Sequence, residues 1–402
     1  MAGGRIRIRI RIGVAGLGAA GHAFVPALRR HPGFEWVALA EPAAEVRTRA
    51  QQEHGVAAYA SLPDLLAHAG LDAVYLATPT ALHAEQVQQA AAAGKHVLVE
   101  KPMATQLDEA RRMVDAAARA GVVLLVGHSH SFDAPIQAMR ELIESGELGA
   151  VRMVNTWCFT DWLHRPRRAD ELDAERGGGV TFRQGAHQFD VIRLLCGGGA
   201  RSVRAKVFDW DPQRRAIGAH IAFIDFEDGA AATAVYNGYG GLSSMDLCFD
   251  ISEWGLHQPP AQRQRRQAST AMQTPEQALK AKQVRARTAI PDHAPYQPFF
   301  GLTVVSCERG DIRQSPAGLL VHTAEGQREI AVSLSRSPRD RVLDEFHEAI
   351  EGGRSPVHDG RWGLANLELC VAALESSRSG REVALREQVE CARGGYSGAR
   401  SP

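Results

Sequence analysis

A short segment of the chain, residues 183–190, combines three residue types that can do chemistry. Arg183, His187 and Asp190 stand at i, i+4 and i+7, a spacing that predicts one stripe of a helix. The neighbouring apolar stripe, which would seat this helix on a core, consists of Phe182, Ala186, Phe189 and Ile192. A cation, a proton carrier and a carboxylate that face the same way are unusual for a packing helix, so the segment predicts a chemical site.

The elements that must position this site begin with a glycine-rich turn. Residues 16–21, Gly-Leu-Gly-Ala-Ala-Gly, follow a predicted strand over 10–15 and precede a predicted helix over 23–29. Glycines permit a tight turn and let the backbone approach a pyrophosphate, which then lies on the free N–H groups of the helix N-terminus. The turn therefore predicts a dinucleotide site, made by Gly16, Gly18, Ala19, Ala20 and Gly21.

Glu41 follows the next predicted strand, over 36–40, at about the distance from the glycines where such sites place an acid. Its carboxylate would accept hydrogen bonds from the adenosine ribose and repel a 2′-phosphate, which favours NAD over NADP. A solvated carboxylate at a strand end is the alternative interpretation.

Lys101 stands at the end of a further strand, 96–99, in the tripeptide Glu100-Lys101-Pro102. Residues 8–120 alternate strand and helix patterns, which is typical of a parallel sheet. Ligands of such sheets bind outside the carboxyl ends of the strands, so Lys101 should emerge beside a nicotinamide. A desolvated lysine next to a cationic ring loses its proton more readily, which makes Lys101 a candidate general acid or base. Taken alone, the tripeptide fits a surface lysine as well.

In combination, these motifs resemble the Gfo/Idh/MocA family of NAD(P)-dependent oxidoreductases, which act on sugars, inositols and related cyclic alcohols. The resemblance covers nearly the whole chain and is carried by residues 16–21, by Ala77-Thr78-Pro79 with His83, by residues 95–102, and by Gly185, His187 and Asp190. It implies that Lys101 and His187 are the catalytic pair, and that Lys101–Pro102 is a cis peptide. It also implies that Thr78, Pro79, His83 and Glu100 lie at the cofactor.

The same resemblance implies the fold. We expect an α/β Rossmann domain with a doubly wound parallel sheet over residues 1–127, and an α+β domain with an open, mainly antiparallel sheet over 128–392. The helices at about 338–376 should pack back on the first domain, and residues 393–402 should form a flexible tail. Relatives often assemble through the second sheet, so a homo-oligomer, dimer or tetramer, is expected.

Arg183 departs from the family pattern, in which an Asp usually stands four residues before the catalytic histidine. A guanidinium there removes an acceptor for hydroxyl groups and supplies a fork suited to a carboxylate, which predicts an acidic substrate. Arg165 and Arg168, in the loop upstream, are further candidates for binding it, although acids in the same loop nearly balance their charge. Asp190 would contact substrate or orient His187, with a structural role equally open.

Two histidines, His128 and His130, also depart from the Asn-Arg-Arg-Phe pattern of many relatives. As alternate residues of a strand they would point the same way, but no third metal ligand accompanies them. We therefore expect no metal and favour hydrogen-bonding or substrate-facing roles, with His130 at the substrate.

A narrower group within the family, the phthalate 4,5-cis-dihydrodiol dehydrogenases, is similar in residues 129–135, 165–168 and 177–188 and in a long insertion near 252–300. The resemblance implies NAD-dependent oxidation of a cyclic cis-dihydrodiol carboxylate, here phthalate 4,5-cis-dihydrodiol to 4,5-dihydroxyphthalate in aromatic degradation. A dehydrogenase of a sugar, inositol or sugar acid is the first alternative, and an NAD-binding regulator without turnover is the second.

Composition restricts the remaining classes of partner. Lys+Arg and Asp+Glu are equal at 46 each, so no overall charge attracts nucleic acid or an anionic membrane, and no run reaches membrane-spanning length. The 6 cysteines lack close pairs, which fits reduced thiols in the cytoplasm. The alternating Arg-Ile residues 5–12 are interpreted as an extension of the first strand. The basic insertion is interpreted as a solvated or oligomer-contacting arm.

Overall fold

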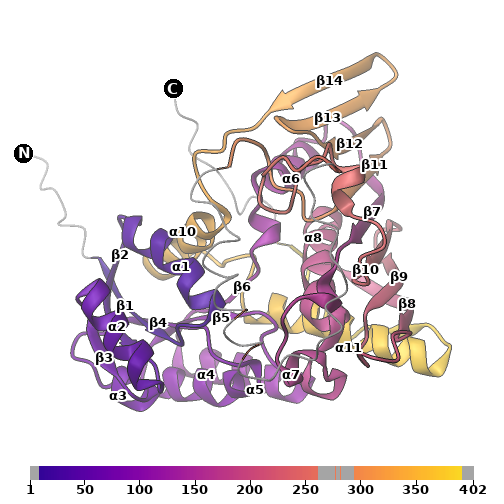
Figure 1. Cartoon of the computed structure of the whole chain (residues 1–402). Helices are drawn as coiled ribbons and strands as arrows, with labels where there is room; N and C mark the ends of the chain where they lie inside the picture. Colours follow the sequence, from indigo (N-terminus) through magenta and orange to yellow (C-terminus); the bar gives the residue numbers. More distant parts are fainter. Residues whose placement is uncertain (1–8, 261–276, 278–280, 282–293, 392–402) are drawn as a thin grey trace, which may run out of the picture.

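The computed structural model describes residues 9–260, 277, 281 and 294–391, and it contains two β-sheets (Figure 1). The first is a six-stranded parallel sheet in the order β3-β2-β1-β4-β5-β6, which confirms the predicted doubly wound fold. Its strands are β1 Ile10–Ala15, β2 Phe34–Ala40, β3 Ala57–Tyr59, β4 Ala73–Leu76, β5 His96–Glu100 and β6 Leu124–Gly127. The connecting helices are α1 Ala19–Arg30, α2 Ala44–His54, α3 Leu62–Leu66, α4 His83–Ala92 and α5 Leu107–Ala120.

The second sheet has nine strands in the order β14-β13-β12-β11-β7-β10-β9-β8-β15 and is antiparallel except where β7 pairs with β10. Its strands are β7 Val151–Phe159, β8 Ala200–Phe208, β9 Ala219–Phe226, β10 Ala231–Asn237, β11 Leu302–Cys307, β12 Gly310–Gln314, β13 Gly318–Thr323, β14 Gly326–Ala331 and β15 Val383–Ala384. The accompanying helices are α6 Ala134–Glu144, α7 Ala169–Leu172, α8 Ala186–Cys196, α10 Pro338–Glu351 and α11 Gly360–Ser379. The predicted open, mainly antiparallel sheet is therefore confirmed.

Helix α8 is buried on every side, because it packs against β7, α6 and α11. The apolar stripe expected for it lies in the main hydrophobic core, as Phe182, Ala186, Phe189 and Ile192 show. However, the helix begins only at Ala186, and residues Thr181–Gly185 form a wider π-helical turn before it. The predicted single helical stripe of chemical residues is therefore wrong in its geometry.

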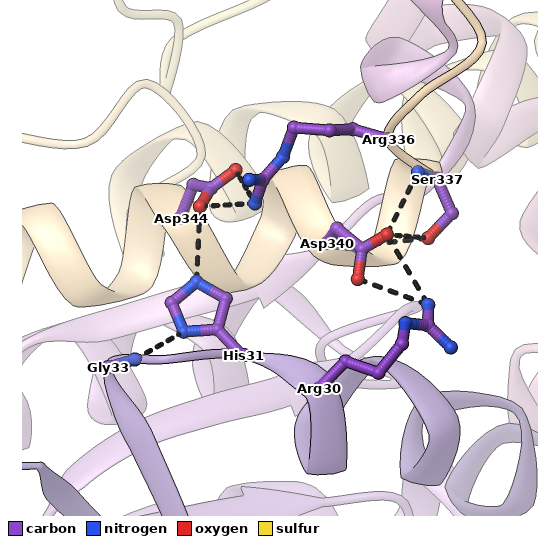
Figure 2. Close-up of polar contacts among 7 residues, drawn as sticks. All are labelled: Arg30, His31, Gly33, Arg336, Ser337, Asp340 and Asp344. Carbon is purple, nitrogen blue, oxygen red and sulfur yellow. Dashed lines mark hydrogen bonds and ion pairs between the residues drawn. The ribbon is translucent and has the colours of Figure 1, made fainter.

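Helix α10 lies on the first sheet beside α1, and a polar cluster holds its first turns there (Figure 2). The Arg30 guanidinium bonds both carboxylate oxygens of Asp340, at 3.3 and 3.4 Å. His31 accepts the backbone N–H of Gly33 through Nδ1, so its Nε2 carries the hydrogen that it donates to Asp344 at 3.1 Å. Phe346 stacks on Phe34 below this cluster. These contacts fix the start of α10 on the first sheet.

The outer face of the second sheet carries large apolar side chains with little cover. Trp157, Ile221 and Phe223 are 38 to 50% exposed, and Trp157 and Ile221 lie in register across β10. The first part of the Arg-Ile segment and the basic residues of the insertion fall outside the described residues, so those two interpretations stay predictions.

Candidate active site

A cleft of about 780 Å³ runs along the carboxyl edge of the first sheet and continues under the second domain. Its walls include most of the residues predicted from the sequence: Gly16, Gly18, Ala19, Ala20, Glu41, Thr78, Pro79, His83, Glu100, Lys101, His130, Arg165, Arg168, Arg183 and His187. Gly21 and Asp190 are not among them. The structure thus brings the glycine turn, Lys101 and His187 to one cavity, although they are far apart in sequence.

The glycine turn fits the pyrophosphate of a dinucleotide. Gly16 has a φ of +89°, and a Cβ there would lie 2.8 Å from the carbonyl oxygen of Ala77. Gly21 allows α1 to pass close beneath the turn, since a Cβ would lie 2.2 Å from the Gly16 carbonyl oxygen. At Gly18 a Cβ would meet nothing within 4 Å, which leaves room for a ligand above the first N–H groups of α1.

Glu41 lies in the cleft with its carboxylate held in place by the backbone. One oxygen accepts the N–H of Leu17 at 3.1 Å and the other accepts the N–H of Ala43 at 3.0 Å. Each oxygen keeps a further lone pair, so the carboxylate retains acceptors for the two hydroxyl groups of a ribose. The geometry fits the adenosine end of NAD.

His83 ties together the two loops that form the floor of the cleft. Its ring nitrogens lie 3.1 Å from the carbonyl oxygen of Pro102 and 2.9 Å from that of Thr78. Burial lowers the pKa of His83 to about 4, so the ring is neutral. The Lys101–Pro102 peptide is cis, as expected. His83 therefore shapes the cleft through the backbone of both loops.

Lys101 is the central cation of the cleft. Its Nζ donates a hydrogen bond to the carbonyl oxygen of Arg183 at 3.0 Å. Burial lowers the pKa of Lys101 to about 8, Glu100 opposes the shift, and the charge of Arg183 adds to it. The Glu100 carboxylate accepts a hydrogen bond from the Tyr75 hydroxyl at 2.7 Å, and burial raises its pKa. A lysine with this pKa can give a proton as the ammonium or take one as the amine near neutral pH.

His187 also lines the cleft, buried among aromatic rings. Its ring is 4.6 Å from that of His130 and 5.2 Å from that of Phe300, centroid to centroid. Burial, assisted by the charge of Lys101, holds the pKa of His187 well below its usual range. Within the described part of the chain its Nδ1 has no hydrogen-bond partner. A neutral imidazole with a free nitrogen can exchange a proton with a bound hydroxyl group.

Asp190 does not reach the cleft, which corrects its predicted role at the substrate. The side chain is fully buried, and one of its oxygens accepts the indole N–H of Trp362, from α11, at 2.7 Å. The same oxygen lies 3.7 Å from His358, and the other lies 3.9 Å from His128. The expectation failed because α8 is buried all round, so a polar residue on it can face the interior instead of a ligand.

His128 and His130 also separate, contrary to the prediction that they point the same way. Strand β6 ends at Gly127, and the chain then turns into a 3-10 helix over His130–Phe132. His130 lines the cleft with its Nδ1 bonded to Asp133 at 3.0 Å, whereas His128 is buried near Asp190. In the described ranges, no three histidine, cysteine or acidic side chains are grouped to hold a metal ion.

The arginines of the cleft differ in their partners. Arg165 bonds Asp161 at 2.7 Å, and Arg168 bonds both oxygens of Asp170 at 3.0 and 2.7 Å. Arg183 has one hydrogen bond, from a terminal nitrogen to the Thr80 hydroxyl at 3.3 Å. Its Nε is buried, and no described residue bonds it. Arg183 is therefore the predicted substrate arginine that lacks a carboxylate bonded to its guanidinium.

Comparison with known proteins agrees with this geometry. A model of the Gfo/Idh/MocA oxidoreductase family, NAD-binding Rossmann fold, matches residues 10–128, and a model of the GFO/IDH/MocA C-terminal domain matches residues 136–246. A 1-carboxy-3-chloro-3,4-dihydroxycyclohexa-1,5-diene dehydrogenase from Comamonas testosteroni is 41% identical over 308 residues, which are 74% of this chain and 76% of that enzyme. The chain belongs to the Gfo/Idh/MocA oxidoreductase family.

Solved structures show the same fold. A Bordetella bronchiseptica protein described as a dehydrogenase superposes with a TM-score of 0.88 and is 38% identical, over 94% of this chain and 100% of that one. The WlbA dehydrogenase of Bordetella pertussis, solved with NADH and UDP-GlcNAcA, has a TM-score of 0.69 at 24% identity, over 94% and 99% of the two chains. This member of the family is thus an NAD-dependent oxidoreductase with a Rossmann domain.

Among the lining residues that were not predicted from the sequence of this family member are Trp254 and Arg339. Trp254 stands at the start of the insertion, where no local pattern distinguishes it from a loop aromatic. Arg339 comes from the first turn of α10, and it reaches the cleft only because α10 docks on the first sheet. A signal existed for neither residue within its own segment, since both depend on contacts between distant parts of the chain.

Proposed function

We propose that this oxidoreductase oxidises a cis-dihydrodiol on a ring that bears a carboxylate, with phthalate 4,5-cis-dihydrodiol as the leading candidate. The observation that carries the proposal is Arg183, a guanidinium in the wall of the cleft beside Lys101 with no carboxylate bonded to it. The relative from Comamonas testosteroni, named as a dehydrogenase of a carboxylated dihydroxycyclohexadiene, supports the same class of substrate.

In this proposal the protein's residues divide the work between binding and proton transfer. Arg183 holds the carboxylate and so fixes which ring carbon faces the cofactor. Lys101, with a pKa near 8, accepts the proton of the reacting hydroxyl, and the His187 imidazole, which lines the cleft, positions that hydroxyl. NAD supplies the hydride acceptor. The ketone formed from a dihydrodiol then tautomerises to a catechol, and the aromaticity gained draws the reaction forward.

The test is production of NADH, followed by its absorbance, from purified protein and a panel of alcohols. Dihydrodiols of benzoate and phthalate should be oxidised far faster than myo-inositol, glucose and uronates. Turnover of a sugar or inositol with none of the dihydrodiols would overturn the proposal in favour of the first alternative. An absence of NADH production from every alcohol would favour a regulator.

The catalytic assignment has its own test in Lys101→Met. General acid–base catalysis contributes about 100- to 10,000-fold to a rate, so kcat should fall by that order while NADH binding is retained. The binding of NADH is measured by its fluorescence. A Lys101→Met enzyme with wild-type kcat would exclude this lysine as the base.

We also propose that two copies of the chain associate through the outer face of the second sheet. Exposed apolar side chains that lie in register across β10, Trp157 on β7 and Ile221 on β9, mark a surface of this kind. Light scattering should give an oligomer for the wild type and a monomer for Ile221→Glu. A monomeric wild type would contradict the proposal.

A further inference from the structure

Arg339 is the second guanidinium in the cleft without a bonded carboxylate. It is placed at the start of α10, and its Nε is buried with no hydrogen-bond partner in the described part of the chain. The guanidinium carbon lies 5.8 Å from the ring centre of Phe24 and 5.9 Å from that of Trp254. These rings restrict the side chain without accepting hydrogen bonds as a carboxylate would, and the side chain lines the cleft.

Arg339 and Arg183 approach the cleft from different walls. Arg183 has Thr80 and the acids of α7 as neighbours, whereas Arg339 has Phe24, Trp254 and Glu100. The side chains of Glu100 and Lys101 point toward different walls, since successive side chains at a strand end point to opposite faces. The Lys101 ammonium meets the Arg183 backbone, and the Glu100 carboxylate lies near Arg339.

The acids near Arg339 do not neutralise it as an ion pair would. No carboxylate of the described residues lies within the 4 Å of an ion pair with Arg339. Glu100 is engaged by the Tyr75 hydroxyl, and Asp133 by His130. Burial raises the pKa of both acids. A partly desolvated guanidinium in these surroundings favours an anionic ligand.

We propose that Arg339 determines specificity by binding a second anionic group of the substrate, across the cleft from the carboxylate held by Arg183. This inference rests on the proposed function and sharpens it from a ring carboxylate to a ring with two anionic groups. The neighbours of Arg339 include Trp254 and Asp133, the partner of His130, which places it on the substrate side of the cleft. The glycine turn and Glu41, where the phosphates and adenosine of NAD fit, are not among its neighbours.

The position of Arg339 is set by the cluster in Figure 2. Asp340, the next residue, caps the first turn of α10 by accepting the Ser337 N–H at 2.9 Å, and it also receives the bonds of Arg30. Arg336 pairs with Asp344 on the same side, at 2.6 Å. Because this cluster restrains the helix start independently of Arg339, a change at Arg339 should leave α10 in place. Arg354→Gln is the matched control, since it removes an exposed arginine that pairs with Glu348 of α10, outside both the cleft and this cluster.

The experiment is calorimetric titration of the NADH-loaded protein with aromatic acids that cannot be oxidised as alcohols. Benzoate carries one carboxylate, and phthalate, isophthalate and terephthalate carry two at increasing separation. We expect the best dicarboxylate to bind wild type and Arg354→Gln at least about tenfold tighter than benzoate. Arg339→Gln should abolish that preference while benzoate binding changes less than about twofold, and Arg339→Lys should restore part of it. Arg183→Gln should weaken every acid.

Three outcomes would overturn the proposal for Arg339. They are a wild type that binds no dicarboxylate more tightly than benzoate, an Arg339→Gln protein that keeps the preference, and one that loses NADH affinity instead. The last result would assign the guanidinium to the cofactor. The failure of the proposed function looks different, because then none of the aromatic acids binds wild type and no dihydrodiol is oxidised.

Discussion

The cleft holds two kinds of arginine, and the difference between them lies in their partners. Arg165 and Arg168, in the loop before α7, are each bonded to a nearby carboxylate, Asp161 in that loop and Asp170 in α7. Arg183 and Arg339 come from helical segments on either side of the cleft, and neither has a bonded carboxylate in the described structure. The comparison teaches that nearness to a cavity does not make an arginine a ligand-binding residue. The deciding property is whether the protein already satisfies its charge.

Burial explains why this difference has consequences. A solvent-exposed ion pair contributes only about 0–1 kcal/mol, so the loop can carry Arg168 with Asp170 at little cost or benefit. A buried donor without an acceptor costs about 1–3 kcal/mol, which a bound carboxylate removes. The guanidinium groups of Arg183 and Arg339, which line the cleft without a bonded carboxylate in the described structure, therefore favour an anionic ligand, and the paired arginines do not.

The largest expected effect concerns Asp190, a fully buried carboxylate that lies against Trp362, His128 and His358. Burial alone would raise its pKa, but His128 and His358 outweigh burial and lower it. Removing one member of a buried charge cluster costs about 3–5 kcal/mol, so Asp190→Asn should lower the free energy of unfolding by that order. Urea unfolding measures it. Asp108→Asn, at an exposed site, should stay within about 0.5 kcal/mol.

The stability that Asp190 contributes should also depend on pH. Its pKa is lower in the folded protein than in the unfolded chain, so the contribution is complete above the unfolded value and disappears as pH falls through the folded one. Unfolding measured between pH 7 and pH 3 should therefore show a smaller gap between wild type and Asp190→Asn at acid pH. If the two proteins were equally stable at pH 7 and Asp190→Asn had lost activity, Asp190 would have a catalytic role and not a structural one.

The next effect is that of Arg183→Gln on turnover. Hydrogen bonds to charged groups contribute about 1.5–3 kcal/mol, so kcat/KM for a carboxylated dihydrodiol should fall by about 10- to 150-fold. Most of the loss should appear in KM, because the carboxylate is bound equally in the ground and transition states. A neutral dihydrodiol should lose far less with the same variant. Equal losses for the acidic and neutral substrates would mean that Arg183 does not bind the acid.

The pH profile gives a smaller and more specific effect. Lys101 acts as a base only when it is deprotonated, so kcat/KM should rise with pH up to about 8 and level above it. The charge of Arg183 is one of the causes that lower this pKa, whereas Arg168 is not. Arg183→Gln should therefore move the rise to higher pH, and Arg168→Gln should leave it in place. A pH profile that does not move with Arg183→Gln would show that the charge of Arg183 does not lower the pKa of Lys101.

The sequence predicts the site residues at the strand ends of the first domain better than the residues that are placed by packing between distant elements. The glycine turn, Glu41 and Lys101 were predicted because each follows a strand of its own βα unit, and the carboxyl ends of those strands share one edge. Asp190 was misplaced because spacing along a helix gives relative directions and does not tell which side is buried. Trp254 and Arg339 could not be predicted, since their places depend on how an insertion and α10 pack on distant elements.

The smallest expected effect is that of Arg168→Gln. Its guanidinium is about one-third exposed and is bonded to Asp170, so removing its charge frees an acid that water can solvate. We expect kcat/KM for the acidic dihydrodiol to change by less than about threefold, with the ratio between acidic and neutral substrates unchanged. The measurement uses the substrate pair already compared for Arg183→Gln. A loss confined to the acidic substrate would show that Arg168 leaves Asp170 to bind the ligand. The pairing of an arginine with a carboxylate would then not tell whether that arginine binds the substrate.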